Sequence, residues 1–209
     1  MLQGKKHHIS KGQSLHMEGV MVFGVITSGY VKRYLITDDG SESIQSIYGP
    51  DDMFPLTPVY KELIGLDLYK GEEVLYYSAM TDVVMYSISK DKLVQSVTEN
   101  PELYKDLFYV AGIRLNSNIQ RLENSSLKTA NRKVIDMILY YAERFGKKTE
   151  NGAELQLPLT HQTIANMLNI ARETVSNVMV RLQERGLVLQ QSRFRIAIPE
   201  LDALRQARH

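Results

Sequence analysis

Cysteine is absent from the 209-residue sequence, and this absence excludes several kinds of protein. Without thiols the chain has no disulfide, no cysteine-ligated zinc, no thiolate-held iron–sulfur cluster and no thiol nucleophile. Long apolar runs are also missing, since none approaches the roughly 18 residues of a membrane-spanning helix. The first eleven residues are polar and carry three lysines. We therefore expect no signal peptide, no membrane partner and a soluble, cytoplasmic protein.

The overall net charge of +1 hides an asymmetry between the two parts of the chain. Residues 1–124 hold 12 Lys and Arg against 16 Asp and Glu, which is a net charge of −4. Residues 125–209 hold 13 against 8, which is a net charge of +5. The pattern predicts two domains with different partners, the second of which binds a polyanion.

The first part of the sequence is rich in short β-favouring runs separated by Gly, Pro and Asp turns. These runs cover residues 20–26, 30–36, 42–48, 74–77 and 83–88. The Asp39-Gly40 pair between the second and third runs is typical of a β-hairpin turn. Regularly spaced short strands predict a sandwich, a barrel or a jelly roll.

A long helix follows Pro101, after which more than twenty residues lack a strong break. Six positions fall near heptad spacing and predict a dimer seam: Leu103, Leu107, Val110, Arg114, Ser117 and Arg121. The alternative is that this helix packs back on the β-domain. A second helix is predicted over residues 128–145.

The most informative segment lies in the basic part of the chain, at residues 159–188. Thr160 is placed to cap a short helix, and Asn169 suits the left-handed turn that ends it. A second helix follows, with Val175, Val178, Met179 and Leu182 on its buried face and Gly186 after its end. This is the helix-turn-helix pattern, whose second helix lies in the major groove of DNA. Residues 187–190 and 194–198 predict a hairpin, or wing, behind it.

The chain resembles the Crp/Fnr (cyclic-AMP receptor protein/fumarate-and-nitrate regulator) family of transcription factors over nearly its whole length. The resemblance is carried by residues 9–19, 26–32 and above all 171–177, Ala-Arg-Glu-Thr-Val-Ser-Asn. It implies an α+β fold with an N-terminal cyclic-nucleotide-binding-type β-roll (jelly roll), a long dimerisation helix and a C-terminal winged helix-turn-helix. The corresponding domain ranges are 1–98, 99–125 and 126–209. It also implies a homodimer that binds double-stranded DNA at a palindromic site.

Four residues near the start of the recognition helix are predicted to contact bases. The guanidinium of Arg172 matches the O6 and N7 acceptors of guanine, and Glu173 accepts from the amino group of cytosine. The resemblance assigns base reading to both positions. Asn177 stands where the family usually has Arg and favours adenine, and Ser176 is short enough to touch a base edge or a phosphate. The alternative for each residue is a solvated side chain.

Five other residues are predicted to contact phosphates, which positions a protein on DNA without reading its sequence. They are Thr160, His161, Gln162, Arg181 and Arg193. In family activators the loop before the helix-turn-helix touches RNA polymerase. That loop matches residues 147–154 here, where the alternative is a polar turn without a partner.

The sensory part departs from the family pattern. Cyclic-nucleotide binders of the family carry a Gly-Glu pair and an Arg-Ser pair, but no Arg or Lys lies between Gly71 and Ile88 here. We therefore expect no cyclic-AMP site, no cofactor and no metal; His7, His8 and His16 are interpreted as solvated rather than haem ligands. A pocket for an unknown effector is predicted from Tyr76, Tyr77, Ser117, Asn118 and Arg121. The alternative makes Ser117 and Asn118 polar residues of the dimer seam.

Two rival functions come from other classes of protein. The first is a small-molecule sensing module in which DNA binding is secondary. The second is an enzyme, but the sequence shows no Ser-His-Asp spacing, phosphate loop, metal-binding His pair or carboxylate dyad. The sequence therefore predicts a sequence-specific regulator of transcription without catalytic residues.

Overall fold

The computed structural model describes residues 4–15, 23–55, 59, 61, 63, 65, 75–126, 129–192 and 195–208. The chain forms two compact units, residues 1–118 and 119–209, and the division falls within helix α3 (Leu103–Ser126). The predicted three-part division, with a separate dimerisation helix, stays a prediction. In the described part of the chain no helix is both long and apolar enough to cross a membrane.

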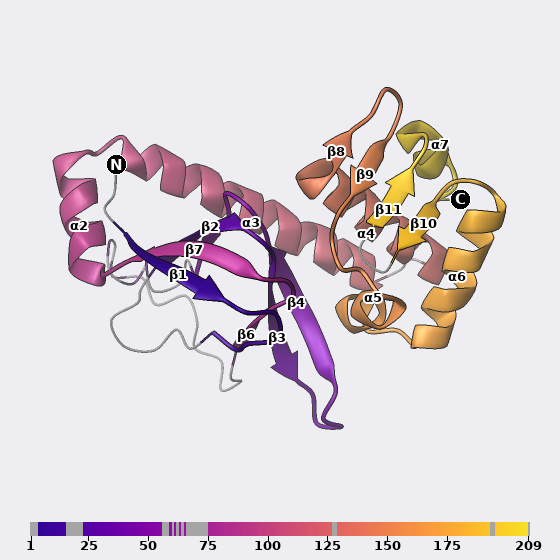
Figure 1. Cartoon of the computed structure of the whole chain (residues 1–209), viewed down its shortest axis with the longest axis horizontal. Coiled ribbons are helices and arrows are strands. Elements are labelled where there is room, and N and C mark those ends of the chain that lie inside the picture. The colour runs from indigo at the N-terminus through magenta and orange to yellow at the C-terminus, as the bar shows by residue number, and fades with distance from the viewer. Residues whose placement is uncertain are drawn as a thin grey trace. The chain divides into compact units, whose positions relative to one another are not determined.

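The first unit contains two antiparallel sheets, as predicted for a β-roll (Figure 1). One sheet has the order β1-β7-β2-β5 and the other the order β4-β3-β6. The strands are β1 (Lys5–Ile9), β2 (Phe23–Ser28), β3 (Val31–Ile36), β4 (Glu42–Tyr48), β5 (Met53–Phe54), β6 (Tyr76–Ala79) and β7 (Val83–Ile88). Rings of Tyr48, Phe54 and Tyr77 pack together in the buried core of this unit, with centroids 4.8 to 6.3 Å apart.

The predicted hairpin turn joins β3 to β4. Gly40 takes the positive φ of 79° that glycine tolerates, and its N–H donates to the carbonyl of Thr37. The Asp39 carboxylate accepts bonds from the Thr37 hydroxyl and from the hydroxyl and backbone N–H of Ser41. These bonds lower the pKa of Asp39 from 3.8 to about 2. This stabilisation of the folded turn is therefore present above pH 3.8 and is lost as the pH falls towards 2.

The N-terminal segment differs from the sequence-based expectation of a polar tail. Residues Lys5–Ile9 form strand β1, which pairs antiparallel with β7 from Lys5 opposite Ser87 to Ile9 opposite Val83. The His7 imidazole is hydrogen-bonded to the Ser87 hydroxyl at 2.8 Å and is not simply solvated. Partial burial, and next the charge of Lys5, lower the pKa of His7. His8 is exposed, and His16 lies outside the described residues.

Two residues of the predicted dimer seam pack instead inside the first unit. Helix α2 (Lys90–Glu99) and the start of α3 complete an apolar cluster with Phe23 and Ile88. Leu107 belongs to this cluster and is only 8% exposed, and Leu103 packs against it. Leu103 and Leu107 thus cover the β-roll. This agrees with the alternative in which the long helix packs back on the β-domain. Val110 is half-buried, and the side chains of Arg114, Ser117 and Arg121 are not among those described.

The second unit combines four helices with a four-stranded sheet of order β10-β11-β9-β8. Its helices are α4 (Ala130–Phe145), α5 (His161–Leu168), α6 (Arg172–Glu184) and α7 (Leu201–Gln206). Its strands are β8 (Lys147–Lys148), β9 (Ala153–Leu155), β10 (Leu189–Ser192) and β11 (Arg195–Ile198). The predicted wing is present as the β10–β11 hairpin, although Gln191 and Ser192 lie in β10 rather than in the turn. Residues 147–154 are not a loop, because they form the β8–β9 hairpin.

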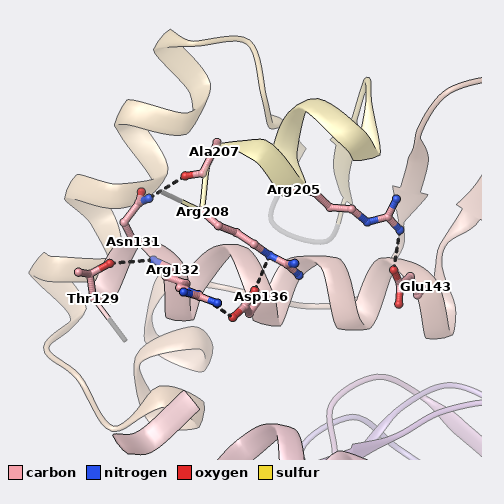
Figure 2. A network of polar contacts seen from close by, with 8 residues as sticks. All are labelled: Thr129, Asn131, Arg132, Asp136, Glu143, Arg205, Ala207 and Arg208. Carbon is pink, nitrogen blue, oxygen red and sulfur yellow. Dashed lines mark hydrogen bonds and ion pairs between the residues drawn. The ribbon is translucent and has the colours of Figure 1, made fainter. Parts of the chain in front are cut away.

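A network of polar contacts clamps the C-terminal helix onto α4 (Figure 2). Nε of Arg208 lies 2.6 Å from Oδ1 of Asp136, whose side chain is only 12% exposed. Arg205 joins Glu143 of α4 at 2.8 Å and Asp202 of its own helix at 2.7 Å. Asn131 donates its amide to the carbonyl of Ala207 at 3.1 Å. Arg205, Ala207 and Arg208 of the C-terminal segment thus each contact a residue of α4. Together these contacts fix the position of the C-terminal segment.

We expect Asp136→Ala to destabilise the second unit by about 1–3 kcal/mol, because the change leaves a partly buried guanidinium without its carboxylate. Asp202→Ala is the matched control, since the side chain of Asp202 is 85% exposed and its ion pair contributes at most about 1 kcal/mol. Amide hydrogen exchange of α4 and α7 measures both effects. Equal loss of protection in the two variants would contradict the role assigned to Asp136.

Candidate nucleic-acid interface

Two consecutive helices, α5 and α6, form the helix-turn-helix of the second unit (Figure 1). The Thr160 hydroxyl accepts from the N–H of Thr163 and caps α5, as predicted. Asn169 has φ and ψ of 50° and ends α5 in the left-handed conformation. Ala171 then starts α6 without a side-chain cap, so the first N–H groups of α6 have no side-chain partner there.

Helix α6 has one buried face and one exposed face. The buried face consists of the four predicted residues Val175, Val178, Met179 and Leu182, each at most 1% exposed. Because an α-helix turns 100° per residue, burying these positions sends residues 173, 177, 180 and 184 outward. The structure thus separates a packing face from a face available to a partner.

The predicted base-contact residues lie in two different environments. Arg172, Glu173 and Asn177 are exposed. Ser176 is half-buried, at the side of α6 that faces α5, where its hydroxyl lies 2.9 Å from Nδ1 of His161. The structure therefore brings together Ser176 and His161, which the sequence assigned to separate contacts with DNA.

Val180 also lies on the exposed face of α6, and the sequence analysis missed it. Its side chain is 49% exposed, one turn beyond Ser176 and Asn177. Glu173, Ser176, Asn177 and Val180 stand at i, i+3, i+4 and i+7, the spacing with which homeodomain recognition helices read bases. The sequence already shows Val180 as an apolar residue outside the buried stripe of α6. The methyl groups of Val180 suit contact with the methyl group of thymine.

The residues predicted to contact phosphates are engaged to different degrees. The hydroxyl of Thr160 serves as the helix cap, the Gln162 amide donates to Asn166 at 2.6 Å, and Nε of Arg181 donates to the carbonyl of Asn177 at 3.2 Å. Gln162 and Arg181 are exposed, and Arg193 lies outside the described residues. The prediction that His161 contacts a phosphate is wrong. Its Nδ1 is hydrogen-bonded to Ser176 and its Nε2 is buried, so neither ring nitrogen is presented to a phosphate.

The predicted effector pocket is not assembled as expected. Tyr76 and Tyr77 are neighbours on strand β6, so their side chains point to opposite faces of the sheet. Tyr76 is 42% exposed and stacks on Tyr34 at 5.5 Å, whereas Tyr77 is buried in the core. One pocket therefore cannot contain both rings. Asn118 is exposed, and the side chains of Ser117 and Arg121 are not described.

A basic residue of the β-roll that the sequence did not single out lies outside residues 71–88, on strand β3. Arg33 of β3 lies directly opposite Tyr77 of β6, and directly opposite residues share a face of a sheet. Arg33 is thus on the inner face, beside the aromatic core. Its Nε is buried and, in the described part of the chain, has no hydrogen-bond partner. A buried Nε–H without an acceptor requires a physical explanation.

Helix α3 has an exposed apolar face that differs from the predicted seam. Phe108, Leu115 and Leu122 repeat every seven residues and are 81%, 62% and 68% exposed. On the same face, Gly112 has open space around its Cα, and a hollow of about 800 Å³ lies between Tyr104, Phe108 and neighbouring side chains. Heptad repetition of exposed apolar residues is typical of a helix that pairs with another helix.

Known proteins share both the sequence and the architecture of this chain. Residues 132–207 match the Crp-like helix-turn-helix domain. The chain is 25% identical over 205 residues to the fumarate and nitrate reduction regulatory protein of Escherichia coli, covering 97% of this chain and 78% of that protein. It is 26% identical over 164 residues to a CRP-like cAMP-activated global transcriptional regulator of Mycobacterium tuberculosis, covering 78% of this chain and 70% of the relative.

The fold itself is shared with a solved regulator. The structure of FixK2 from Bradyrhizobium japonicum covers 100% of this chain and 98% of its own, with a TM-score of 0.79 and 18% sequence identity. The two sequence relatives are regulators of transcription rather than enzymes. Together with the β-roll, the long helix and the winged helix-turn-helix described above, these similarities confirm the predicted resemblance to the Crp/Fnr transcription regulators: residues 132–207 form a Crp-like helix-turn-helix DNA-binding domain, and the two sequence relatives are regulators of transcription.

Proposed function

We propose that this regulator acts as a homodimer that reads a palindromic DNA site through the exposed face of α6. The observation that carries the proposal is the exposure of Glu173 and Asn177 on the side of α6 opposite its packed face, together with the exposure of Arg172 at the first position of the helix. One such helix reads only a few base pairs, and a twofold dimer places two of them in half-sites about one helical turn apart.

Contacts with the DNA backbone come from residues around this helix. Gln162 and Arg181 are exposed and carry N–H donors suited to phosphate oxygens. Thr160 and Arg193 are the other predicted phosphate contacts, and His161 is left out because its Nδ1 is bonded to Ser176. These contacts set the register of the helix on DNA and make binding dependent on salt concentration.

The proposed dimer forms through the exposed apolar face of α3. Phe108 and Leu115 project at heptad spacing, and Gly112 leaves a hollow between them for a side chain of the partner. A second copy of the chain presents the same face. The projecting side chains of each copy can therefore fit into the hollow at Gly112 of the other copy, by twofold symmetry. At 100° per residue, the predicted seam positions Val110, Arg114, Ser117 and Arg121 fall on the other side of α3 from Phe108 and Leu115, so this interface does not use them.

The β8–β9 hairpin, residues 147–154, is the proposed contact with RNA polymerase. Lys147, Lys148 and Glu150 are exposed there, so their charges are available to a protein partner. The hairpin is held by pairing of Lys147 with Glu154 and of Lys148 with Ala153, which gives such a contact a fixed shape.

A second proposed function is the sensing of an anionic small molecule by the β-roll. It is favoured by Arg33, whose Nε is buried on the inner face without a hydrogen-bond partner among the described residues. A carboxylate or phosphate group would supply the missing acceptors, and guanidinium binds both in the two-pronged geometry. The adjacent rings of Tyr48, Phe54 and Tyr77 would favour an anion that also carries apolar surface.

Selection from random DNA duplexes tests the DNA-binding proposal. The unaltered chain is expected to enrich a palindrome, and a flat sequence profile would reject the proposal. Arg172→Ala is expected to lose about 1–3 kcal/mol on the selected site and to relax one base position in each half. Arg185→Ala, an equally exposed arginine at the other end of α6, is the matched control and should keep the profile. Uniform weakening of Arg172→Ala across all sequences would instead make Arg172 a phosphate contact.

Introducing a charge into the exposed face of α3 tests the proposed dimer. Because Leu115→Glu places two carboxylates in an apolar interface, we expect the dimer dissociation constant to rise on the order of a hundredfold. Light scattering measures the change, and affinity for the palindrome should fall with it. Ile36→Glu is the control, since Ile36 is an exposed apolar residue of β3, 49% exposed. A Leu115→Glu chain that remains dimeric would contradict this interface.

Replacing Arg33 tests the anion proposal through stability. Arg33→Gln removes a buried N–H that has no acceptor among the described residues, so we expect the free energy of unfolding to rise by about 1 kcal/mol without added anion. Phosphate and acetate, compared with chloride at equal ionic strength, should raise the melting temperature of the unaltered chain but not of this variant. Lys32→Gln is the control, because Lys32 is paired with Glu42 and its loss should destabilise the fold while the anion response persists. Destabilisation by Arg33→Gln would show that Arg33 is an ordinary structural residue.

A further inference from the structure

A hydrogen bond between the two helices of the DNA-binding motif joins His161 to Ser176. His161 is the first residue of α5, and Ser176 lies in the second turn of α6. Nδ1 of His161 and Oγ of Ser176 are 2.9 Å apart, a normal length for a hydrogen bond in which either partner could donate. Which of the two donates determines what the Ser176 hydroxyl can offer to DNA.

The surroundings of Nε2, the other ring nitrogen of His161, indicate which of the two residues donates. Nε2 of His161 is buried and has no hydrogen-bond partner among the residues that the structure describes. A neutral imidazole carries one N–H and one bare nitrogen. A proton on Nε2 would be a buried donor without an acceptor, and orphaned buried N–H groups are rare in proteins. The proton therefore sits on Nδ1, and Nδ1–H donates to Oγ of Ser176.

This direction of donation leaves the hydroxyl hydrogen of Ser176 free. Its oxygen accepts from His161, and within the described chain no acceptor takes its hydrogen. Ser176 is half-buried at the side of α6 that faces α5, three residues after the exposed Glu173 and one before the exposed Asn177. A hydroxyl that accepts from His161 keeps its hydrogen for a further acceptor, and its second lone pair stays open as well.

We propose that His161 is a positioning residue that makes Ser176 a hydrogen-bond donor to the base edge. The base atoms that such a donor recognises are the acceptors of the major groove: purine N7, guanine O6 and thymine O4. If the hydrogen of Ser176 were instead bound to His161, the hydroxyl could only accept and could not bind these atoms. The proposal rests on the proposed function, since it assigns one side chain of the same reading face its base chemistry.

Nuclear magnetic resonance of the histidine ring nitrogens in the full-length chain tests the direction of donation without DNA. The His161 signals are assigned by their loss in His161→Gln. We expect a neutral ring with the proton on Nδ1 and a bare Nε2. A proton on Nε2 would overturn the proposal, because Ser176 would then be the donor to His161 and an acceptor towards DNA.

Selection from random duplexes tests the consequence for DNA. Ser176→Ala and His161→Ala are expected to lose the preference at the same base position, by roughly tenfold, with the other positions unchanged. His161→Asn places an amide N–H near the position of Nδ1 and should restore the preference, whereas His161→Gln places its amide near the position of Nε2 and should not.

Two outcomes would overturn the role of His161. Uniform weakening by His161→Ala on all sequences would show only a structural contribution to the motif, and an unchanged preference would show that Ser176 acts without His161. A flat profile for the unaltered chain would contradict the proposed function itself. The ring-nitrogen measurement, which needs no DNA, tells that failure apart from a failure of the inference.

Discussion

The burial of one face of α6 is the constraint on which the functional surface depends. Val175, Val178, Met179 and Leu182 are almost completely removed from water, and each contributes about 1.5–3 kcal/mol through that burial. Because these four side chains fix the rotation of the helix about its own axis, the direction of every other α6 side chain follows. Glu173 and Asn177 therefore point away from the packed face, whereas Arg172, seven residues before the buried Met179, is exposed at the first position of the helix.

The scaffold behind α6 is held by two different kinds of interaction on α4. Val134, Ile135, Ile138 and Leu139 are buried and supply the apolar side of the unit. Polar residues of the same helix bind the C-terminal segment through Arg205 and Arg208, as Figure 2 shows. A helix held by both apolar and polar contacts is a firm base for a reading surface, since base recognition tolerates little displacement of the side chains.

Helix α3 shows why a repeat of apolar residues does not identify its partner. Leu103 and Leu107 follow the heptad spacing expected of a dimer seam, yet they cover the β-roll. Phe108 and Leu115 follow the same spacing on another face and remain exposed. A helix with two apolar faces has two partners, and the spacing alone cannot say which face meets which partner.

Much of the architecture was determined by local patterns in the sequence. The Asp39-Gly40 turn, the Thr160 cap, the left-handed Asn169 and the buried stripe of α6 each depend on a few neighbouring residues, and all were predicted correctly. Their physical causes act within one or two turns of chain: a conformational preference, a capping hydroxyl and a 3.6-residue period. The family resemblance, confirmed by the related regulators, extended these local features to the whole fold.

Only the tertiary structure decided how side chains distant in sequence affect one another. His7 is hydrogen-bonded to Ser87, and Arg33 lies opposite Tyr77 on the inner face of its sheet. His161 is hydrogen-bonded to Ser176 and is therefore not available to the expected phosphate. Each of these outcomes depends on a partner between 15 and 80 residues away. The sequence specifies which chemical groups are present, but whether a group is free, paired or buried is set by the neighbours that folding brings to it.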